Sequence, residues 1–470
     1  MTSRSASVAL ALTLVFASSA HAQSTPTAYQ TLGRDILREL IETNTTYASG
    51  STTRASELLA ARFRAAGFPA ADVQIVGPDT GRDAKDRNLV VRYRGNGRRK
   101  PILLIGHLDV VEARRADWVQ DPFTLTERDG HFYGRGTLDM KNGAAAWVAA
   151  LLRMKQEGIV PAGDYVLALT AGEEGGGGYN GIQWLLANRR DLLDAEYVLN
   201  PDAGGGELRD GKPIALNVQA AEKVFHSVHL TVRNPGGHSS APRADNAIYE
   251  LADALKAVQA YRFPVKSNDW TLGSFKATGP VTPGPLGEAM TRFAANPQDE
   301  SAAAEIAKVP TEIGKTRTTC VATMLRGGHA SNALPQTATA TVSCRIFPDT
   351  STDDVKSTLE QVVGKNVQVS FLGSTPPAGA SPLRKDVLAA LTKAAHAQYP
   401  GIPVVPGMVP WATDGAVYRA AGIPTYGVSG SFIKASDSFS HGLNERLPVE
   451  SFYGELTHWY VLLKELAGKR

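Results

Sequence analysis

The sequence predicts an α/β protein with a mostly parallel central sheet and a smaller α+β domain inserted into it. Three observations indicate this fold class. Apolar strand patterns alternate with helical patterns from residue 144 to about 215, which is typical of a parallel sheet covered by helices. Near residue 217 the strands change to alternating polarity, and from residue 382 the strand–helix alternation returns. We therefore predict a large domain at 23–216 and 376–470, with an insertion at 217–375.

Before the alternation, the chain has two predicted helices and three predicted strands. Helical periodicity covers residues 29–44 and 51–66, and Gly67 follows the second helix. Short apolar runs indicate strands at 73–76, 88–93 and 102–105. The dipeptide Asn96-Gly97 lies between the last two strands and predicts a hairpin there.

The other elements of the large domain follow in alternation. Before the insertion we expect helices and strands in turn at 144–156, 164–171, 179–189 and 195–200. After it we expect helices at 385–398, 414–421 and 449–466, and strands at 404–408 and 424–428. The carboxyl ends of the parallel strands are where ligands bind in sheets of this kind.

The inserted region has the pattern of antiparallel strands followed by helices. Residues 225–232 alternate apolar and polar side chains, as a half-buried antiparallel strand does. Residues 263–315 look irregular apart from two short helices near 287–296 and 301–307. We expect further helices at 246–260 and 352–363, and further strands at 318–325, 337–347 and 367–372. The composition of residues 373–381 is typical of a linker.

Residues 1–22 have the features of a secretory signal peptide. Arg4 supplies a positive charge, residues 8–16 form a short apolar core, and Ala20-His21-Ala22 is a small-x-small cleavage site. We predict cleavage after Ala22 and a periplasmic or secreted protein. No apolar run reaches membrane-spanning length, so we expect no membrane association. The net charge of +3 is small and the basic residues are scattered, so we expect no nucleic-acid partner.

The two cysteines of the chain lie on predicted neighbouring strands. A hairpin centred near Asn332 would place Cys320 opposite Cys344. In an oxidising compartment a disulfide is the hypothesis, and two buried free thiols are the alternative. Neither cysteine has the spacing of a metal site.

Acids and imidazoles gather at the ends of several predicted strands. Any one of them has an ordinary structural explanation, such as an N-cap for an Asp. Together on one sheet edge they would repel and desolvate one another without cations. Carboxylates mixed with imidazoles fit zinc, with cobalt or manganese as alternatives. The candidate residues are His107, Asp109, Asp139, Glu173, Glu174, Asp202 and His441.

The number of these residues suits two metal ions, with one carboxylate bridging them and one acid left over. Two such ions lower the pKa of a water held between them. A carboxylate beside that water can take its proton and return it to a leaving amine. The predicted reaction is therefore metal-assisted hydrolysis of an amide or similar carbonyl. The residues alone leave open whether Glu173 or Glu174 is the base.

Five motifs, taken in order, resemble the M20 family of metallopeptidases, which includes carboxypeptidases, dipeptidases, aminoacylases and desuccinylases. The resemblance covers residues 30–465 and implies a di-zinc peptidase sandwich with an inserted lid domain that often dimerises. The motifs are His107-Leu-Asp-Val-Val, Gly134-Arg-Gly-Thr-Leu-Asp139-Met-Lys, Gly172-Glu-Glu-Gly175, Gly236-Gly-His-Ser-Ser240 and Asn332-Ala-Leu-Pro335.

The resemblance also implies a role for each position. His107 and Asp202 would bind one metal ion, Glu174 and His441 the other, and Asp139 would bridge them. Glu173 would be the general base. Asp109 would hydrogen-bond to His107 and fix its tautomer. In the large domain, the sequence departs from the family pattern at Asn142, where Gly is usual, and at Glu112, where Pro is common.

Four residues outside the metal site are implied to contact substrate. His238 would steady the oxyanion, often from the partner subunit of a dimer. Asn332 and Arg345 would hold the substrate backbone and its terminal carboxylate, because an Arg fork binds a carboxylate through two hydrogen bonds. Gly430 would lie in a loop that lines the substrate pocket.

These features predict an exported, zinc-dependent exopeptidase that acts on short peptides, most simply a carboxypeptidase or dipeptidase. An N-acyl amino acid amidohydrolase with the same mechanism is the alternative. A non-catalytic metal-binding protein is an alternative of another class, but such a protein has no use for a base at Glu173. The chain has no Gly-x-Ser-x-Gly elbow and no Gly-Lys-Ser/Thr phosphate loop, so a serine hydrolase and a nucleotide-binding protein are disfavoured.

Overall fold

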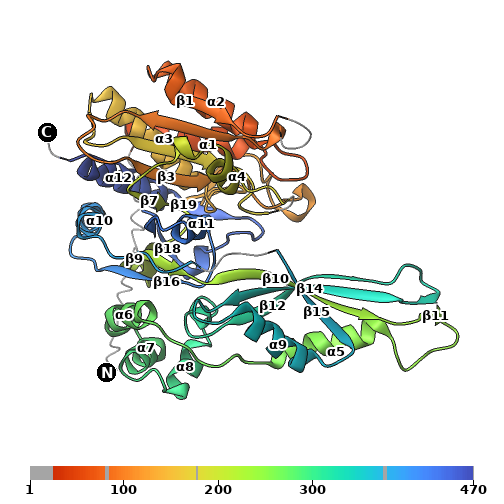
Figure 1. The fold of residues 1–470 in the computed structure, drawn as a ribbon. Coiled ribbons are helices and arrows are strands. Elements are labelled where there is room, and N and C mark those ends of the chain that lie inside the picture. The colour runs from red at the N-terminus through yellow and green to blue at the C-terminus, as the bar shows by residue number, and fades with distance from the viewer. Residues whose placement is uncertain (1–24, 80–83, 176–177, 374–377, 469–470) are drawn as a thin grey trace, which may run out of the picture.

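Two sheets of different construction organise the molecule (Figure 1). The computed structural model describes residues 25–79, 84–175, 178–373 and 378–468. The predicted signal peptide, residues 1–22, lies outside these described residues. The larger sheet carries both the N-terminal and the C-terminal parts of the chain, and the smaller sheet is built from the middle of it.

The larger sheet has a parallel centre, and its described part contains ten strands in the order β1-β2-β6-β3-β7-β17-β9-β8-β18, with β16 paired to β9. Strands β6, β3, β7 and β17 run parallel to one another. The predicted mostly parallel arrangement is thus confirmed at the centre, and antiparallel pairs flank it. The strands are β1 (Val73–Val76), β2 (Asn88–Tyr93), β3 (Ile102–His107), β6 (Tyr165–Thr170), β7 (Tyr197–Asn200), β8 (Gly205–Arg209), β9 (Lys212–Glu222), β16 (Val404–Val409), β17 (Thr425–Gly427) and β18 (Phe432–Lys434).

The hairpin predicted at Asn96-Gly97 is wrong, because β6 lies between β2 and β3. The backbone of the connecting loop bonds to the segment around the start of β6 instead of closing a turn. The N–H of Asn96 donates to the carbonyl of Pro161 at 2.8 Å, and the N–H of Gly95 donates to Asp164 Oδ1 at 2.8 Å. The Asn96-Gly97 dipeptide therefore predicted correctly that the chain reverses direction, but it did not reveal that β6 lies between the two strands it connects.

Helices cover both faces of the larger sheet. Alternate residues of β3 lie on opposite faces of the sheet: Leu104 packs in the core on one side and Leu103 in the core on the other. One core contains residues of α1 (Ala28–Glu42), α2 (Thr52–Ala65), α3 (Lys141–Gln156), α10 (Lys385–Gln398) and α12 (Val449–Leu466). The other contains residues of α4 (Gly181–Asn188) and α11 (Gly415–Ala420).

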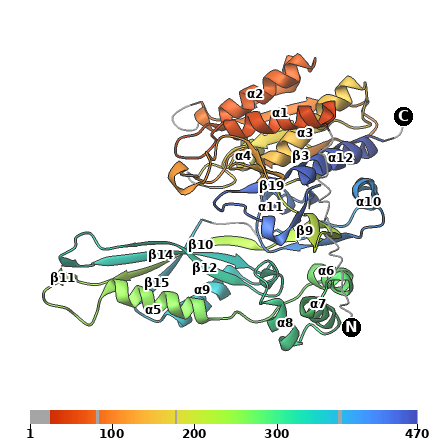
Figure 2. The same ribbon diagram turned by 180° about the vertical axis from the view of Figure 1, so that it is seen from behind.

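The smaller sheet is antiparallel, in the order β12-β14-β10-β15, with α5 and α9 packed against it (Figure 2). Its register places Cys320 opposite Cys344, and the two form a disulfide, so that hypothesis is confirmed. A two-stranded extension forms its far end. The elements are β10 (Val224–Arg233), β12 (Thr319–Gly327), β14 (Thr337–Ile346), β15 (Val367–Leu372), β11 (Gly237–His238), β13 (Ala333–Leu334), α5 (Ala247–Ala260) and α9 (Thr352–Val363).

The boundary between the two sheets lies a few residues beyond the predicted position. Residue 217 falls inside β9, which still belongs to the larger sheet, and the next strand, β10, starts the smaller one. The region expected to be irregular contains an additional helix, α6, which packs on β16 and β9 of the larger sheet. The helices of this region are α6 (Asp269–Thr278), α7 (Pro285–Ala295) and α8 (Glu300–Ile306).

A third, short antiparallel sheet joins distant parts of the chain beside the larger sheet. It consists of β4 (Thr126–Arg128), β5 (His131–Tyr133) and β19 (Arg446–Pro448). Pairing of β19 with β5 brings the loop before β19 next to the loop after β5. Within the described ranges, no helix combines the length and the apolar character needed to cross a bilayer.

Candidate metal centre

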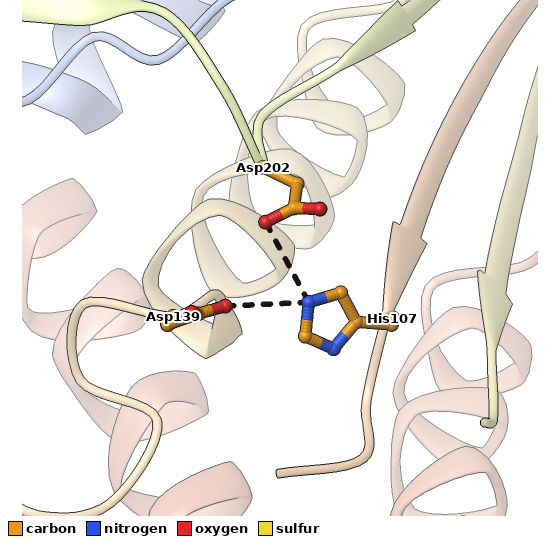
Figure 3. A group of neighbouring side chains, drawn as sticks. All are labelled: His107, Asp139 and Asp202. Atoms are coloured by element: carbon orange, nitrogen blue, oxygen red, sulfur yellow. Dashed lines mark ion pairs between the residues drawn. The ribbon is translucent and has the colours of Figure 1, made fainter. Parts of the chain in front are cut away.

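The parallel strands deliver the first candidate ligands to one edge of the larger sheet. His107 is the last residue of β3, which runs parallel to β7, and Asp202 follows the end of β7 by two residues. Asp139 lies in the loop that leads into α3. Figure 3 shows the side chains of these three residues pointing toward one another.

His107, Asp139 and Asp202 form a first group of possible ligands. His107 Nε2 lies 3.3 Å from Asp139 Oδ1 and 3.7 Å from Asp202 Oδ1. One ligand atom from each residue lies within 4.8 Å of the other two. An imidazole and two carboxylates so close together can share one divalent cation.

Asp139, Glu174 and His441 form a second group. His441 Nε2 lies 3.1 Å from Asp139 Oδ2 and 2.9 Å from Glu174 Oε2. Asp139 therefore belongs to both groups, with one carboxylate oxygen toward each imidazole. The structure brings all five predicted metal ligands together, in two sets that share the residue expected to bridge them.

The donor atoms of the first group fit a cation. His107 Nε2 and Asp139 Oδ1 are buried, and neither has a hydrogen-bond partner within the described part of the chain. Buried polar atoms are almost always bonded, so two unbonded ones that face each other are suited to share a cation. A divalent cation would satisfy both atoms, and the mixed nitrogen and oxygen donors suit zinc.

The electrostatics of the cluster also favour added positive charge. Hydrogen bonds that His441 donates to the carboxylates of Asp139 and Glu174 raise the pKa of His441 to about 10. Burial alone would lower the pKa of His107, but Asp139 and Asp202 raise it well above its ordinary value. Burial raises the pKa of Asp202 to about 7 against the opposing effect of His107. The two imidazoles and Asp202 thus favour bound protons, and a divalent cation can take the place of those protons.

Asp109 has a different position from the one expected. Its carboxylate oxygen is 3.8 Å from His107 Nδ1, too far for a hydrogen bond, and that nitrogen instead lies 2.9 Å from the backbone carbonyl of Asp109. The carboxylate accepts the backbone N–H groups of Glu173 at 3.3 Å and Glu174 at 3.0 Å. Asp109 therefore orients His107 through its main chain and the two glutamates through its side chain.

Glu173, the expected base, lies beside the first group. Burial raises the pKa of Glu173 well above its ordinary value, and Asp202 adds to the effect while His107 opposes it. Both neighbours belong to the first group, so the carboxyl of Glu173 is within electrostatic reach of the candidate cation site. A raised pKa favours the protonated form of the Glu173 carboxyl, which a general base must adopt before it acts as an acid.

Of the predicted substrate residues, Arg345 comes near the cluster. It lies on β14 opposite Phe225 of β10, and its guanidinium stacks on the Phe225 ring at 4.5 Å. Burial lowers the pKa of Arg345, and the carboxylates of Glu173 and Glu222 oppose this shift. Arg345 thus places a positive charge on the side of the smaller sheet that faces Glu173.

The other three predicted substrate residues do not join the cluster within one chain. His238 lies in β11, and Asn332 accepts the N–H of Ser239 through its backbone carbonyl at 3.0 Å. Both residues are exposed at the far end of the smaller sheet, away from the larger one (Figure 1). Gly430 is buried against α12, where an added Cβ would lie 2.4 Å from His458 Cβ.

Three charged residues at the site were not singled out from the sequence. Arg135 and Glu445 form a buried ion pair of 2.6 Å, and Arg135 lies within the motif Gly134-Arg-Gly-Thr-Leu-Asp139-Met-Lys. Asp414 is buried after β16, accepts from Asn180 at 2.7 Å, and acts electrostatically on Glu173. The position of Asp414 after a predicted strand could have indicated a site residue, but the sequence pattern placed Asp414 at the start of a predicted helix.

Both departures from the family pattern have hydrogen-bond partners. Asn142 donates to Glu455 Oε2 at 2.7 Å and so ties the start of α3 to α12. Glu112 accepts the N–H of Ala48 at 2.8 Å. Neither residue replaces a candidate ligand.

The comparison with family models agrees with this geometry. Residues 103–465 match the model of "Peptidase family M20/M25/M40". This range includes all five candidate ligands, Glu173 and the whole smaller sheet.

Individual relatives resemble this chain in sequence, and individual solved structures resemble it in fold. The chain is 29% identical over 383 residues to the N-fatty-acyl-amino acid synthase/hydrolase PM20D1.1 of Danio rerio, covering 79% of this chain and 73% of that protein. It is 29% identical over 293 residues to a probable succinyl-diaminopimelate desuccinylase of Staphylococcus aureus, covering 62% and 64%. The fold resembles the M20 metallo-carboxypeptidase Sso-CP2 of Sulfolobus solfataricus, with a TM-score of 0.70, 18% identity, and 93% and 99% coverage. It also resembles human carnosine dipeptidase 1, with a TM-score of 0.68, 15% identity, and 94% and 99% coverage.

Proposed function

This chain belongs to the peptidase family M20/M25/M40 and is a hydrolase, and we propose that it is an exported, zinc-dependent exopeptidase for short peptides. The observation that carries the proposal is the shared position of Asp139 between two imidazoles, with Oδ1 at 3.3 Å from His107 Nε2 and Oδ2 at 3.1 Å from His441 Nε2. An acid in that position serves two cations at once.

The residues of the proposed site have different roles in hydrolysis. Bound in the two groups, divalent cations supply Lewis-acid polarisation of the carbonyl and a water of lowered pKa. His107 and Asp202 would hold one ion, Glu174 and His441 the other, and Asp139 both. The Glu173 carboxylate takes a proton from the attacking water and donates it to the leaving amine. Arg345 holds the free carboxylate of the substrate through its guanidinium.

Removing the base while keeping the ligands tests the proposal. We expect Glu173→Gln to lower dipeptide turnover by about 10²- to 10⁴-fold, because proton transfer is lost. We expect it to retain both metal ions, measured by elemental analysis. Removal of metal by a chelator should abolish activity, and zinc should restore it. Full activity in a metal-free sample would exclude the mechanism.

A second candidate activity is hydrolysis of N-acyl amino acids, and the sequence relatives favour it. The relatives at 28–30% identity include several N-fatty-acyl-amino acid synthase/hydrolases. Peptides and N-acyl amino acids share an amide bond beside a free carboxylate, so Arg345 and Glu173 would serve both. Rates on Ala-Leu, N-acetyl-Leu and N-dodecanoyl-Leu separate the two activities, because these substrates differ only in the acyl group.

We also propose that two copies of the chain associate through the smaller sheet. Strand β12 is the edge strand of that sheet, and its side chains are exposed: Val321 by 62%, Met324 by 53% and Leu325 by 66%. An unpaired, apolar edge of this length favours pairing with another strand. Association there would bring His238 of one chain toward the metal centre of the other, which a single chain leaves out of reach.

Export through the N-terminal segment is supported by the cysteines. Both cysteines of the described chain are joined in a disulfide, which persists in oxidising compartments and is rare in the cytosol. The N-terminal sequence of the purified protein tests this proposal. A mature chain that begins at Gln23 is the expected result.

A further inference from the structure

We infer that Arg135 and Glu445 are positioning residues that lock together the two loops carrying Asp139 and His441. The inference rests on the proposed metal centre and adds a condition for it: the second group exists only while this pair holds its two loops in place. Neither residue belongs to the candidate ligands. Arg135 comes from the loop after β5 and Glu445 from the loop before β19, and the two loops leave the short sheet at the same end.

Glu445 fixes the loop that carries Asp139. Its Oε1 atom accepts three backbone N–H groups of that loop, from Gly136 at 3.1 Å, Leu138 at 2.8 Å and Asp139 at 3.1 Å. A carboxylate that collects successive backbone donors holds the loop much as a bound anion holds a nest of amides. The direction of the Asp139 side chain is thereby set from the main chain.

Arg135 ties the same loop to the one that carries His441. Its Nη1 atom donates to Glu445 Oε2 at 2.6 Å, and its Nη2 atom donates to the carbonyls of Gly442 at 3.1 Å and His441 at 3.4 Å. His441 has a φ of +64°, a conformation that a residue other than Gly keeps only when its surroundings enforce it. The Arg135 contacts act directly on that backbone.

The burial of the pair makes its loss costly. The side chains of Arg135 and Glu445 are 3% and 0% exposed. Removing one partner would leave a buried charge without its counter-charge, and the loops would rearrange to reach solvent. His107 and Asp202 lie at the ends of β3 and β7 instead, so the first group keeps two of its three residues in place, whereas the second keeps only Glu174.

A zinc titration of the metal-free protein tests the inference, with a competing chelator to measure each affinity. We expect wild type to bind two zinc ions. We expect Glu445→Gln to bind the second about 10- to 100-fold more weakly and the first with a smaller loss, because only Asp139 is disturbed in the first group. Arg135→Lys should show the same selective loss, because a single ammonium cannot replace the fork. His441→Ala removes a residue of the second group, so its zinc titration serves as the reference for a protein that lacks the second site.

Asp164→Asn is the matched control. Asp164 also pairs with an arginine, Arg92 at 2.7 Å, and also accepts a backbone N–H, from Gly95 at 2.8 Å, but it precedes β6 at the opposite end of the sheet. This variant should bind both zinc ions as wild type does. If Glu445→Gln and Arg135→Lys also bind both ions with wild-type affinity, the inference is overturned. If wild type itself binds no zinc, the proposed function fails.

Hydrogen exchange on the wild-type protein adds a test that no folding defect can obscure. If the pair holds the loops, the amides of Gly136, Leu138 and Asp139 are protected before any metal is added. Rapid exchange of these amides in metal-free protein, with protection only after zinc binds, would show that the metal orders the loops and would overturn the inference.

Discussion

At the scale of single residues, the site depends on which atom of each side chain faces which partner. Asp109 illustrates this, because its backbone carbonyl contacts His107 and its carboxylate accepts the backbone N–H groups of Glu173 and Glu174. We therefore expect a change of the Asp109 carboxylate to affect Glu173 and Glu174 more than His107.

The variant Asp109→Asn separates the two roles. An amide cannot accept both backbone N–H groups, so we expect turnover to fall by about 10- to 100-fold through misplacement of Glu173 and Glu174. Retention of the metal ion at His107 should accompany this loss, because the carbonyl of Asp109 remains. The measurements are turnover and metal content, with exposed Asp117→Asn as control. Loss of metal in step with activity would contradict this assignment.

Lys223 makes a pH-dependent contribution to stability at the junction of the two sheets. It is 1% exposed, donates to the carbonyl of Arg317 at 2.6 Å, and has its pKa lowered to about 7 by burial and by Arg345. In the unfolded chain the lysine pKa is about 10.4. Between these values the unfolded chain binds the extra proton, so the contribution of Lys223 to stability increases with pH.

We therefore expect the free energy of unfolding of wild type to rise relative to Lys223→Met by roughly 2 kcal/mol between pH 7.5 and pH 9.5. Urea unfolding at both pH values measures the difference, and other titrating groups cancel in the comparison. Exposed Lys256→Met should follow wild type at both values. Parallel curves for wild type and Lys223→Met would show that this lysine is charged in the folded protein.

At the scale of elements, the contacts between neighbouring segments decide what each position tolerates. Two helical glycines in the α6–α8 region show the contrast. A Cβ at Gly287 of α7 would lie 1.9 Å from the carbonyl oxygen of Thr282, whereas a Cβ at Gly273 of α6 would meet no atom within 4 Å. The same change, Gly to Ala, thus has opposite consequences in two adjacent helices.

We expect Gly287→Ala to destabilise the protein by about 1–3 kcal/mol, because the backbone of Thr282 must move. We expect Gly273→Ala to stabilise it by about 0.5–1 kcal/mol, because Ala loses less conformational freedom in a helix. Each variant serves as the control for the other in thermal unfolding. A shift of the same sign in both would contradict the packing of α7.

At the scale of the whole molecule, the smaller sheet comes near Glu173, and the proposed dimer would complete the proposed site. Arg345 reaches the electrostatic surroundings of Glu173 within one chain. His238 lies at the far end of the smaller sheet (Figures 1 and 2). A dimer formed through β12 would supply it from the partner, and each site would then need residues of both chains.

Complementation between two inactive variants tests this arrangement. In a mixed dimer of Glu173→Ala and His238→Ala, one site lacks both residues and the other has both. If half of the dimers are mixed, co-expression should restore about a quarter of wild-type activity. Each variant expressed alone gives the baseline. A mixture no more active than the separate variants would mean that His238 does not act across chains.

The sequence by itself determined the fold class, most of the elements and the candidate residues of the metal site. Local periodicity reports which face of a helix or strand is buried, and strand ends carry the acids and imidazoles. For these reasons His107, Asp139 and Asp202 could be named as candidates before their distances were known, and the family resemblance implied their roles as metal ligands. The pairing of Cys320 with Cys344 followed from strand register, which is also a local property.

Only the tertiary structure decided how distant segments meet. In the structure β6 lies between β2 and β3, and the boundary between the two sheets lies after β9. The Asp109 carboxylate accepts the backbone N–H groups of Glu173 and Glu174. The structure also revealed that Arg135 and Glu445 join loops about three hundred residues apart. The physical reason is that hydrogen-bond partners depend on side-chain direction and strand order, and neither is encoded in the spacing of residues along the chain.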